Sequence, residues 1–171
     1  ALQHLRHAAK HEDRRVRIEL IDALKRHCDN PKGLDILRQL VYDSDEEIHR
    51  EALTAIVSFT GAEAFAAIGA VVTSESFGQL DPEEQVALLI AYSRAGKEQA
   101  VPYLAGLIER YNPLRNPIRT FMRAVAFDAL EQNPSEKAAK LLANYAGSWR
   151  PDIKRRAEQA IARRKNIGGN Q

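Results

Sequence analysis

Hydrophobic residues recur along this chain at steps of three and four. The first clear case is the phrase VRIELIDAL at residues 16–24, in which Val16, Leu20 and Leu24 fall on one face of a helix. Charged residues such as Arg15 and Glu19 fall on the opposite face. The spacing therefore predicts an amphipathic helix at this position.

The same phrase returns four more times in altered form. The copies are IHREALTAI, EQVALLIAY, MRAVAFDAL and IKRRAEQAI, which start at residues 48, 84, 122 and 153. Successive starts, counted from residue 16, are 32, 36, 38 and 31 residues apart. A period of this size indicates one supersecondary unit that is stacked on itself, as in a solenoid.

A second apolar segment precedes each of the last four phrases, and it predicts the first helix of a pair. These segments are LDILRQLV, AFAAIGAVV, AVPYLAGLI and KAAKLLANYA at residues 34–41, 64–72, 100–108 and 137–146. Asp or Asn followed by Pro separates several units, which suits a helix N-cap with Pro in the first turn. We predict an all-α, right-handed α-solenoid of about five helical hairpins and no strand. The predicted domain covers residues 1–167, with repeats at about 1–28, 29–60, 61–95, 96–132 and 133–167, and a flexible tail at 168–171.

The phrases resemble HEAT repeats, and more loosely the phycobilisome-lyase-like branch of that armadillo-like superfamily. The usual signature is an Asp or Pro before an apolar-Arg pair, followed by alanines and an Ala-Leu end. Asp13, Val16-Arg17 and Ala23-Leu24 match this signature, and so do Met122-Arg123 and Ala129-Leu130. The other copies place His49, Gln85 and Lys154 where the first has Arg17. The resemblance implies a fold and not one function, because such solenoids serve many unrelated tasks.

Composition narrows the class of protein. The chain has 171 residues, of which 44% are hydrophobic, enough for one ordinary folded domain. Its apolar runs fall well short of the roughly 20 residues that cross a bilayer, and no signal peptide is apparent. The single cysteine, Cys28, cannot form an internal disulfide, which favours a reducing, cytoplasmic location. Because the chain starts at Ala1 within a helical pattern, we expect it to be part of a longer protein.

Charge is uneven although the net charge is only +2. Basic residues outnumber acidic ones by 5 to 2 in residues 1–17 and by 7 to 2 in residues 147–171, whereas residues 43–85 hold 1 basic and 10 acidic residues. Two interpretations stay open: solvated helix faces, or a field that steers a charged partner.

The outward face of the second helices predicts where a partner binds. Carrying the register of the first phrase along the chain places Ile90, Phe121 and Val125 on this face, with Glu83 and Arg94 as a charged rim. An exposed apolar patch flanked by charge is typical of a peptide groove. A register error of one residue would bury these side chains instead. We predict a non-enzymatic scaffold or adaptor that binds a protein or peptide partner and needs no cofactor.

Two alternatives stay open. The basic last helix could bind nucleic acid or an anionic surface through Arg156, Arg163 and Arg164, although its charges wrap around the helix and do not form one stripe. The resemblance to the lyase-like repeats implies a second alternative, chaperone-like help in attaching a cofactor to a client protein. The sequence contains no marker of such a cofactor or client.

Catalytic and metal sites have little support. His4, His7 and His11 share one side of the first helix, but no carboxylate or cysteine is placed with them, which favours a solvated face over a metal site. His27 and Cys28 are adjacent and point about 100° apart on a helix, so they do not form a nucleophile and base pair. We predict no catalytic residue and no metal ligand.

Two connections are longer than stacking requires, SESFGQL at residues 74–80 and YNPLRNP at residues 111–117. Insertions in repeat proteins often collect on one face and help to bind partners. The other interpretation is that the sequence and length of these connectors drifted without any role in binding.

Overall fold

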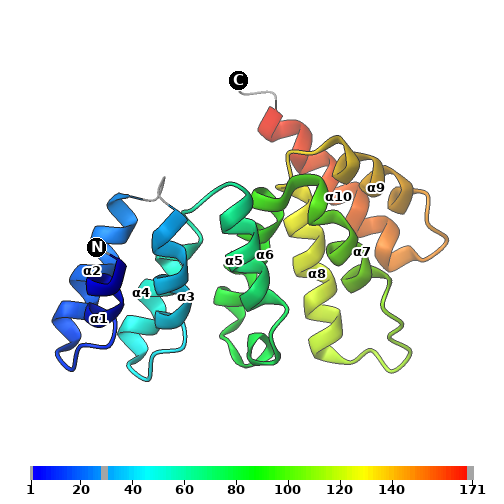
Figure 1. The fold of residues 1–171 in the computed structure, drawn as a ribbon. Coiled ribbons are helices and arrows are strands. Elements are labelled where there is room, and N and C mark those ends of the chain that lie inside the picture. Colours follow the sequence, from blue (N-terminus) through cyan, green and yellow to red (C-terminus); the bar gives the residue numbers. More distant parts are fainter. Residues whose placement is uncertain (1, 28–30, 169–171) are drawn as a thin grey trace. The chain divides into compact units, whose positions relative to one another are not determined.

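The computed structural model describes residues 2–27 and 31–168, and these residues form helices, turns and no strand (Figure 1). The all-α prediction is confirmed. The predicted tail at residues 168–171 starts one residue too early, because Gly168 ends the last helix. The rest of the predicted tail and Cys28 lie outside the described residues. The helices are α1 (Leu2–Ala8), α2 (Arg14–Arg26), α3 (Leu34–Leu40), α4 (Glu46–Ile56), α5 (Ala62–Val72), α6 (Pro82–Gly96), α7 (Val101–Glu109), α8 (Pro117–Glu131), α9 (Glu136–Ala146) and α10 (Pro151–Gly168).

These helices pair into five consecutive hairpins. Each copy of the repeated phrase lies on the second helix of its pair, from α2 to α10. Short 3₁₀ turns occur at Pro31–Gly33, Glu75–Gln79 and Lys97–Gln99. No helix in the described part of the chain combines the length and the apolar character that a membrane span needs.

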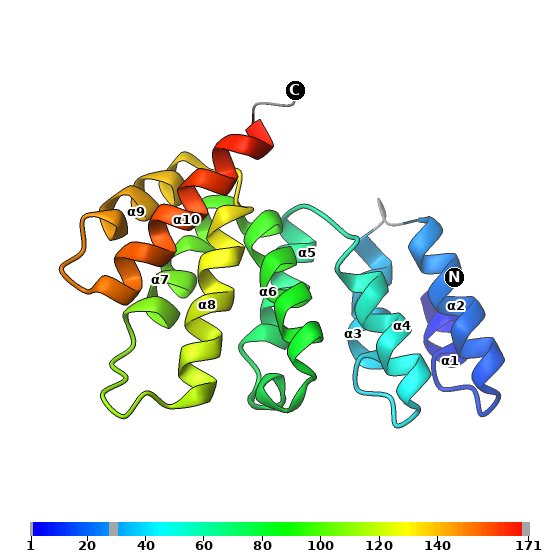
Figure 2. The same cartoon turned by 180° about the vertical axis from the view of Figure 1, so that it is seen from behind.

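The chain divides into two compact units, unit 1 at Ala1–Ala95 and unit 2 at Gly96–Gln171. In unit 1, α2 packs on α4, and α3 packs on α4 and α5. In unit 2, α7 packs on α8, and α10 packs on both α8 and α9. Figures 1 and 2, which view the molecule from opposite sides, show that first helices form one layer of each unit and second helices form the other.

The predicted apolar positions form the core of each unit. Leu24 is buried and Ile36 and Ile48 are fully buried in unit 1, as are Leu104 and Leu130 in unit 2. Burial of a side chain of this size stabilises the fold by roughly 1.5–3 kcal/mol. Hydrophobic packing of amphipathic faces is therefore what holds these short helices in place.

One position of the repeated phrase ties the second helix of the first four hairpins to the chain that leads into it. Arg17 on α2 donates through Nη1 to the carbonyl oxygens of His11 and Glu12, and its Nε lies 3.2 Å from a carboxylate oxygen of Asp43. Arg123 on α8 donates to the carbonyl oxygens of Ile108 and Arg110, both at 2.9 Å. These bonds satisfy carbonyl groups that a helix end leaves without a partner.

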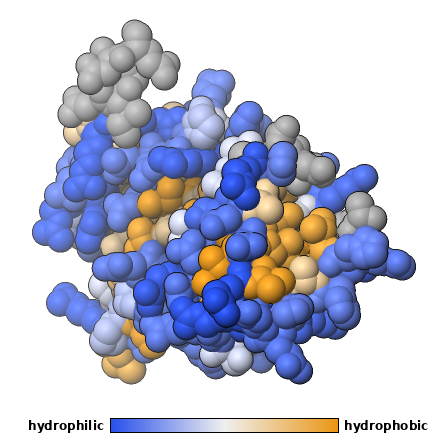
Figure 3. Space-filling view, turned by 90° about the vertical axis from the view of Figure 1, so that its left-hand side faces the viewer, coloured by the Kyte–Doolittle hydropathy of each residue, from blue (hydrophilic) through white to orange (hydrophobic). Residues whose placement is uncertain are grey.

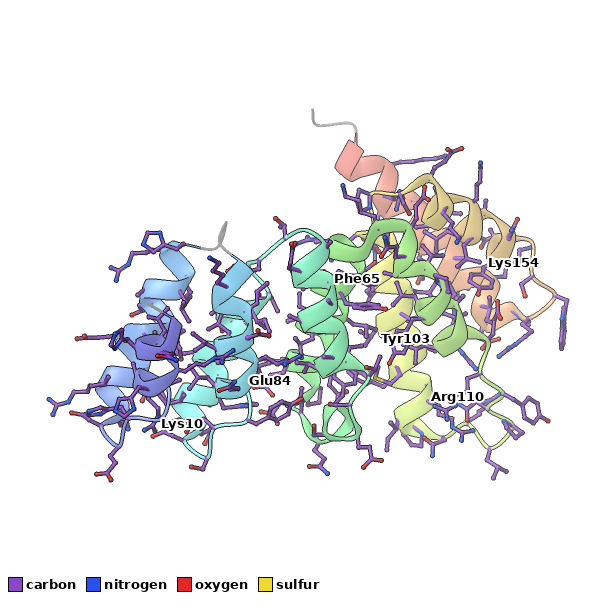
Figure 4. All side chains as sticks on the ribbon, in the orientation of Figure 1. Lys10, Phe65, Glu84, Tyr103, Arg110 and Lys154 are labelled. Carbon is purple, nitrogen blue, oxygen red and sulfur yellow. The ribbon has the colours of Figure 1, made fainter. Side chains whose placement is uncertain are left out.

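Two of the three copies without arginine at this position use other side chains for the same purpose. His49 on α4 forms a hydrogen bond through Nδ1 with the carbonyl oxygen of Val41, and its Nε2 lies 3.2 Å from the Glu84 carboxylate, which Figure 4 labels. Gln85 on α6 donates to the carbonyl oxygens of Phe77 at 3.1 Å and Leu80 at 2.9 Å. The third phrase therefore keeps the register of the others although its first residue is acidic.

The connection at residues 74–80 is not a free insertion. Its Glu75–Gln79 segment is a 3₁₀ turn, and the Phe77 side chain is buried, with 7% of its surface exposed. Because Phe77 is in the core and its carbonyl accepts the Gln85 bond, this side chain supports the third hairpin and is not available to a partner.

The first helix leaves part of one end of unit 1 apolar. On α1, Leu5 is half-buried, and Ala9, just beyond the helix, is buried. Figure 3, viewed from the side that carries α1 and α2, shows hydrophobic areas among hydrophilic side chains.

Candidate functional site

The α6 part of the predicted partner surface lies in unit 1. Glu83 and Arg94 are exposed and Ile90 is half-buried. Glu83 lines an open groove of about 340 Å³ between α4 and α6, whose apolar side includes Leu53 and Val57. The structure thus brings Glu83 to a groove, and Ile90 and Arg94 are not among the residues that line it.

The predicted exposure of Val125 on α8 is wrong. Only 2% of this residue is exposed, and its neighbours Ala126 and Phe127 are also buried. The prediction assumed one buried face along the whole helix, but α8 is covered on a much wider arc from Val125 onward. Phe121, one turn earlier, is half-buried and still reaches a groove.

This groove, between the first turns of α8 and α10 in unit 2, has a volume of about 1010 Å³. Phe121 and Thr120 line it from α8, and Asn112 lines it from the α7–α8 connector. We call it the arginine groove because five arginines line it. These are Arg115, Arg123, Arg150, Arg155 and Arg156.

Asparagine side chains fix the connector that forms one wall of the groove. The Asn116 side chain caps α8 by accepting the backbone N–H of Arg119 at 3.1 Å. Asn112 accepts the N–H of Asn116 at 2.7 Å and donates to the Thr120 hydroxyl at 3.1 Å. Arg115 has a positive φ of 49°, a left-handed conformation that this network holds. The connector at residues 111–117 is therefore an ordered wall.

The groove carries an excess of positive charge. Asp152 is the one acidic residue among those that line it, and it pairs with Arg123 at 3.1 Å and Arg150 at 3.6 Å. Arg155 and Arg156 are exposed, and neither forms an ion pair with any residue that the structure describes. The first turns of α8 and α10 also lie here, and helix N-termini add positive potential.

Large hydrophobic side chains are exposed where the chain enters α8 and α10. Trp149 is 89% exposed and directly precedes Arg150, a residue of the groove. Tyr111, Leu114 and Ile118, at 78%, 91% and 69%, belong to the α7–α8 connector and the first turn of α8. We call these four residues the hydrophobic rim. The length of the connector indicates a binding role from the sequence alone, whereas Trp149, the chain's single tryptophan, lies outside the repeated apolar pattern and gives no such signal.

Two of the three predicted anion-binding arginines are engaged within unit 2. Arg164 donates to the carbonyl oxygens of Leu130 at 3.0 Å, Ser135 at 2.9 Å and Asn133. Arg163 lies 3.4 Å from the Glu131 carboxylate. The prediction is corrected for Arg164, whose guanidinium group already serves the fold, whereas Arg163 is exposed and its part in anion binding stays a prediction. Of the three, Arg156 alone lines the groove.

Burial shifts the ionisation of groups around these contacts. It raises the pKa of the Glu131 carboxyl, an effect that Arg163 opposes and Asp128 reinforces. Burial also lowers the pKa of Arg164 below its ordinary value. Both directions agree with groups that are partly withdrawn from water.

The three histidines near the N-terminus do not converge on a common point. His4, His7 and His11 are all exposed, and the Nδ1 atom of His11 accepts the backbone N–H of Asp13 at 3.1 Å. Within residues 2–27 and 31–168, no group of three or more His, Cys, Asp or Glu residues is placed to hold a metal ion.

Comparison with known families gives one match. Residues 2–78 match the family model described as HEAT repeats, which covers the first two hairpins and the start of the third. A comparison with curated proteins found no match. Beyond residue 78 the chain continues with helical hairpins, in which Gln85 and Arg123 donate to the preceding chain from the position that Arg17 occupies in the first. Residues 2–78 are therefore HEAT repeats, and the hairpins beyond them have the same helical organisation.

Proposed function

We propose that this protein is a non-enzymatic interaction module that binds a partner protein at the arginine groove and its hydrophobic rim. One observation carries the proposal: a groove is lined by five arginines, and exposed hydrophobic residues stand next in sequence to residues that line it. These are Tyr111, Leu114, Ile118 and Trp149. HEAT repeats generally mediate contacts between proteins, which supports this assignment.

The composition of this surface suits a protein interface. Tryptophan, tyrosine and arginine are enriched among the residues that dominate binding energy. A folded protein rarely leaves several large apolar side chains together in water unless they serve a contact. Phe121 gives the groove a half-buried aromatic floor, so a partner side chain that enters would lose contact with water on more than one side.

The test is affinity capture from a native lysate, followed by reconstitution with the purified captured protein. Three forms of the full chain are compared: the unchanged protein, Phe121→Asp, and Tyr42→Asp as a control. Tyr42 is an exposed aromatic of unit 1, so its replacement makes the same charge change away from the groove. Circular dichroism establishes that each variant keeps its helices.

We expect a protein that binds the unchanged chain and Tyr42→Asp, and binds Phe121→Asp at least about tenfold more weakly, a difference of about 1.4 kcal/mol. Equal binding to all three forms would remove the groove from the account. If Tyr42→Asp weakened binding of the captured protein as much as Phe121→Asp does, the groove would also be excluded as the binding site.

A second candidate function is binding of single-stranded nucleic acid. Exposed aromatic side chains beside arginines are also the features on which bases stack and phosphates bind. Arg163 and Arg164 do not extend the basic surface, because they are engaged within unit 2. We therefore place protein binding first, and the captures are run with and without nuclease to separate the two.

A further inference from the structure

We infer that the arginine groove binds an acidic segment of the partner protein, with Asp or Glu carboxylates on the arginines and a neighbouring apolar side chain on the hydrophobic rim. This inference rests on the proposed function and names the chemistry of the partner at the same site. It combines three features of unit 2: the arrangement of charges, the character of the rim and the length of the basic surface.

The charges of the groove are unbalanced. Asp152 neutralises part of the charge of Arg123 and Arg150, which leaves Arg115, Arg155 and Arg156 with no ion pair among the residues that the structure describes. Like charges that share one groove repel each other, so an anionic occupant lowers the electrostatic energy of the groove. A carboxylate accepts two parallel hydrogen bonds from one guanidinium group, which makes Arg better suited than Lys for this task.

The charge of the whole unit has the same sign as the groove. Residues 96–171 contain 14 Lys and Arg against 7 Asp and Glu, a net charge of +7 with histidine neutral. Residues 1–95 contain 11 basic and 16 acidic residues, a net charge of −5. An acidic segment is therefore attracted to unit 2 and repelled by unit 1.

The rim favours a peptide over nucleic acid. Two of its four residues, Leu114 and Ile118, are aliphatic and largely exposed, at 91% and 69%. Aliphatic side chains give no flat surface on which a base stacks, but they pack well against Leu, Ile or Phe of a peptide.

The basic surface is also short. Along α10 it runs from Pro151 to Arg156, which is about 9 Å of helix. The next arginines on α10, Arg163 and Arg164, are engaged with α8 and with the turn that follows it. An extended peptide spans about 3.3 Å per residue, so a few residues reach across the groove, whereas a nucleic acid strand would continue past the basic surface.

The experiment measures fluorescence anisotropy of a labelled probe titrated with the full chain. The probe is a fluorescein-labelled peptide of glutamate and serine with one central leucine, and a second peptide has lysine in place of glutamate. The test variant is R155E/R156E. The matched control is K154E/K165E, which makes the same charge change on the same helix at exposed lysines outside the groove, one of them Lys154, labelled in Figure 4.

We expect the glutamate peptide to bind and the lysine peptide not to bind. R155E/R156E should weaken binding at least about tenfold, and K154E/K165E by no more than about twofold, because charges outside the groove act only through the screened field. R155Q/R156Q is the milder variant that keeps the test valid if charge reversal lowers helicity.

Several results would overturn the inference. Equal weakening by R155E/R156E and K154E/K165E would show a response to net charge and not to the groove. Tighter binding of a labelled single-stranded oligothymidylate that R155E/R156E abolishes would assign the groove to nucleic acid. In a third outcome the glutamate peptide does not bind, but Phe121→Asp still abolishes binding of a captured protein. This outcome would show that the partner segment is not acidic, and the proposed function would still hold.

Discussion

Burial and a hydrogen bond together hold the Tyr145 side chain in its neutral form. Tyr145 on α9 donates its hydroxyl to the Glu109 carboxylate at 2.7 Å, and its ring meets Phe127 edge-on with centroids 5.8 Å apart. Burial raises the pKa of the phenol above its ordinary value, and the hydrogen bond and negative charge of Glu109 raise it further. This contact ties α9 to α7 within unit 2.

The shifted pKa predicts how stability depends on pH. Because the folded-state pKa of Tyr145 is above the unfolded value of about 10, its stabilising contribution is complete at neutral pH and is lost as pH rises beyond 10. Tyr145→Phe should lower the unfolding free energy by about 1 kcal/mol at pH 7 and make its decline above pH 10 shallower. Urea denaturation at a series of pH values measures both effects. A decline as steep in the variant as in the unchanged protein would contradict this assignment. Burial also raises the pKa of Tyr103, so some decline should remain.

At the scale of elements, one arginine joins three helices of unit 2. Arg164 on α10 donates to carbonyl oxygens at the end of α8 and in the turn that leads to α9. The carbonyl oxygens of Leu130 and Ser135 also accept backbone N–H groups, from Asn133 and Ala139, so the guanidinium group is a second donor there. Its role is to close the α8–α9 turn.

We predict that Arg164→Met destabilises the protein by about 1–3 kcal/mol, because it removes a charged donor from three carbonyl oxygens of the α8–α9 turn. Arg163→Met removes only exposed ion pairs, at 3.4 Å and 3.8 Å, and should cost no more than about 1 kcal/mol. Chemical denaturation of the two variants gives the difference. Equal stability of the two would show that Arg164 is not a structural residue.

The helices could be predicted from the sequence because their signal is local. Steps of three and four residues locate α2, α4, α8 and α10, and Asp or Asn before Pro locates the starts of α6 and α8. Even the divergent third copy was aligned correctly, because Gln85 occupies the fastening position.

The site was predicted only in part because it depends on contacts between distant residues. Phe121 and Arg156 were predicted and line one groove, but nothing in the repeat shows that they meet there. The burial of Val125 could not be predicted, because the periodicity of a helix does not show how many neighbouring elements cover it. Arg163 and Arg164 could not be assigned, since their partners lie about thirty residues earlier in the chain.

At the scale of the whole molecule, charge separates the two units. The net charge is −5 for residues 1–95 and +7 for residues 96–171, from 11 against 16 and 14 against 7 charged residues. The two charges almost cancel in the total of +2, so the overall composition conceals them. Binding of an acidic partner should therefore weaken as salt increases, although the protein as a whole is nearly neutral.

The account rests on the arginine groove and its rim as the docking surface, and the chain carries its own reporter there. Trp149 is the single tryptophan, is 89% exposed and is next to Arg150. The most direct measurement is its emission spectrum during titration of the full chain with the unlabelled glutamate peptide. Burial of Trp149 by the peptide predicts a saturable shift to shorter wavelength that R155E/R156E abolishes and K154E/K165E keeps. Peptide binding that leaves the Trp149 emission unchanged would place the docking surface elsewhere and contradict the account.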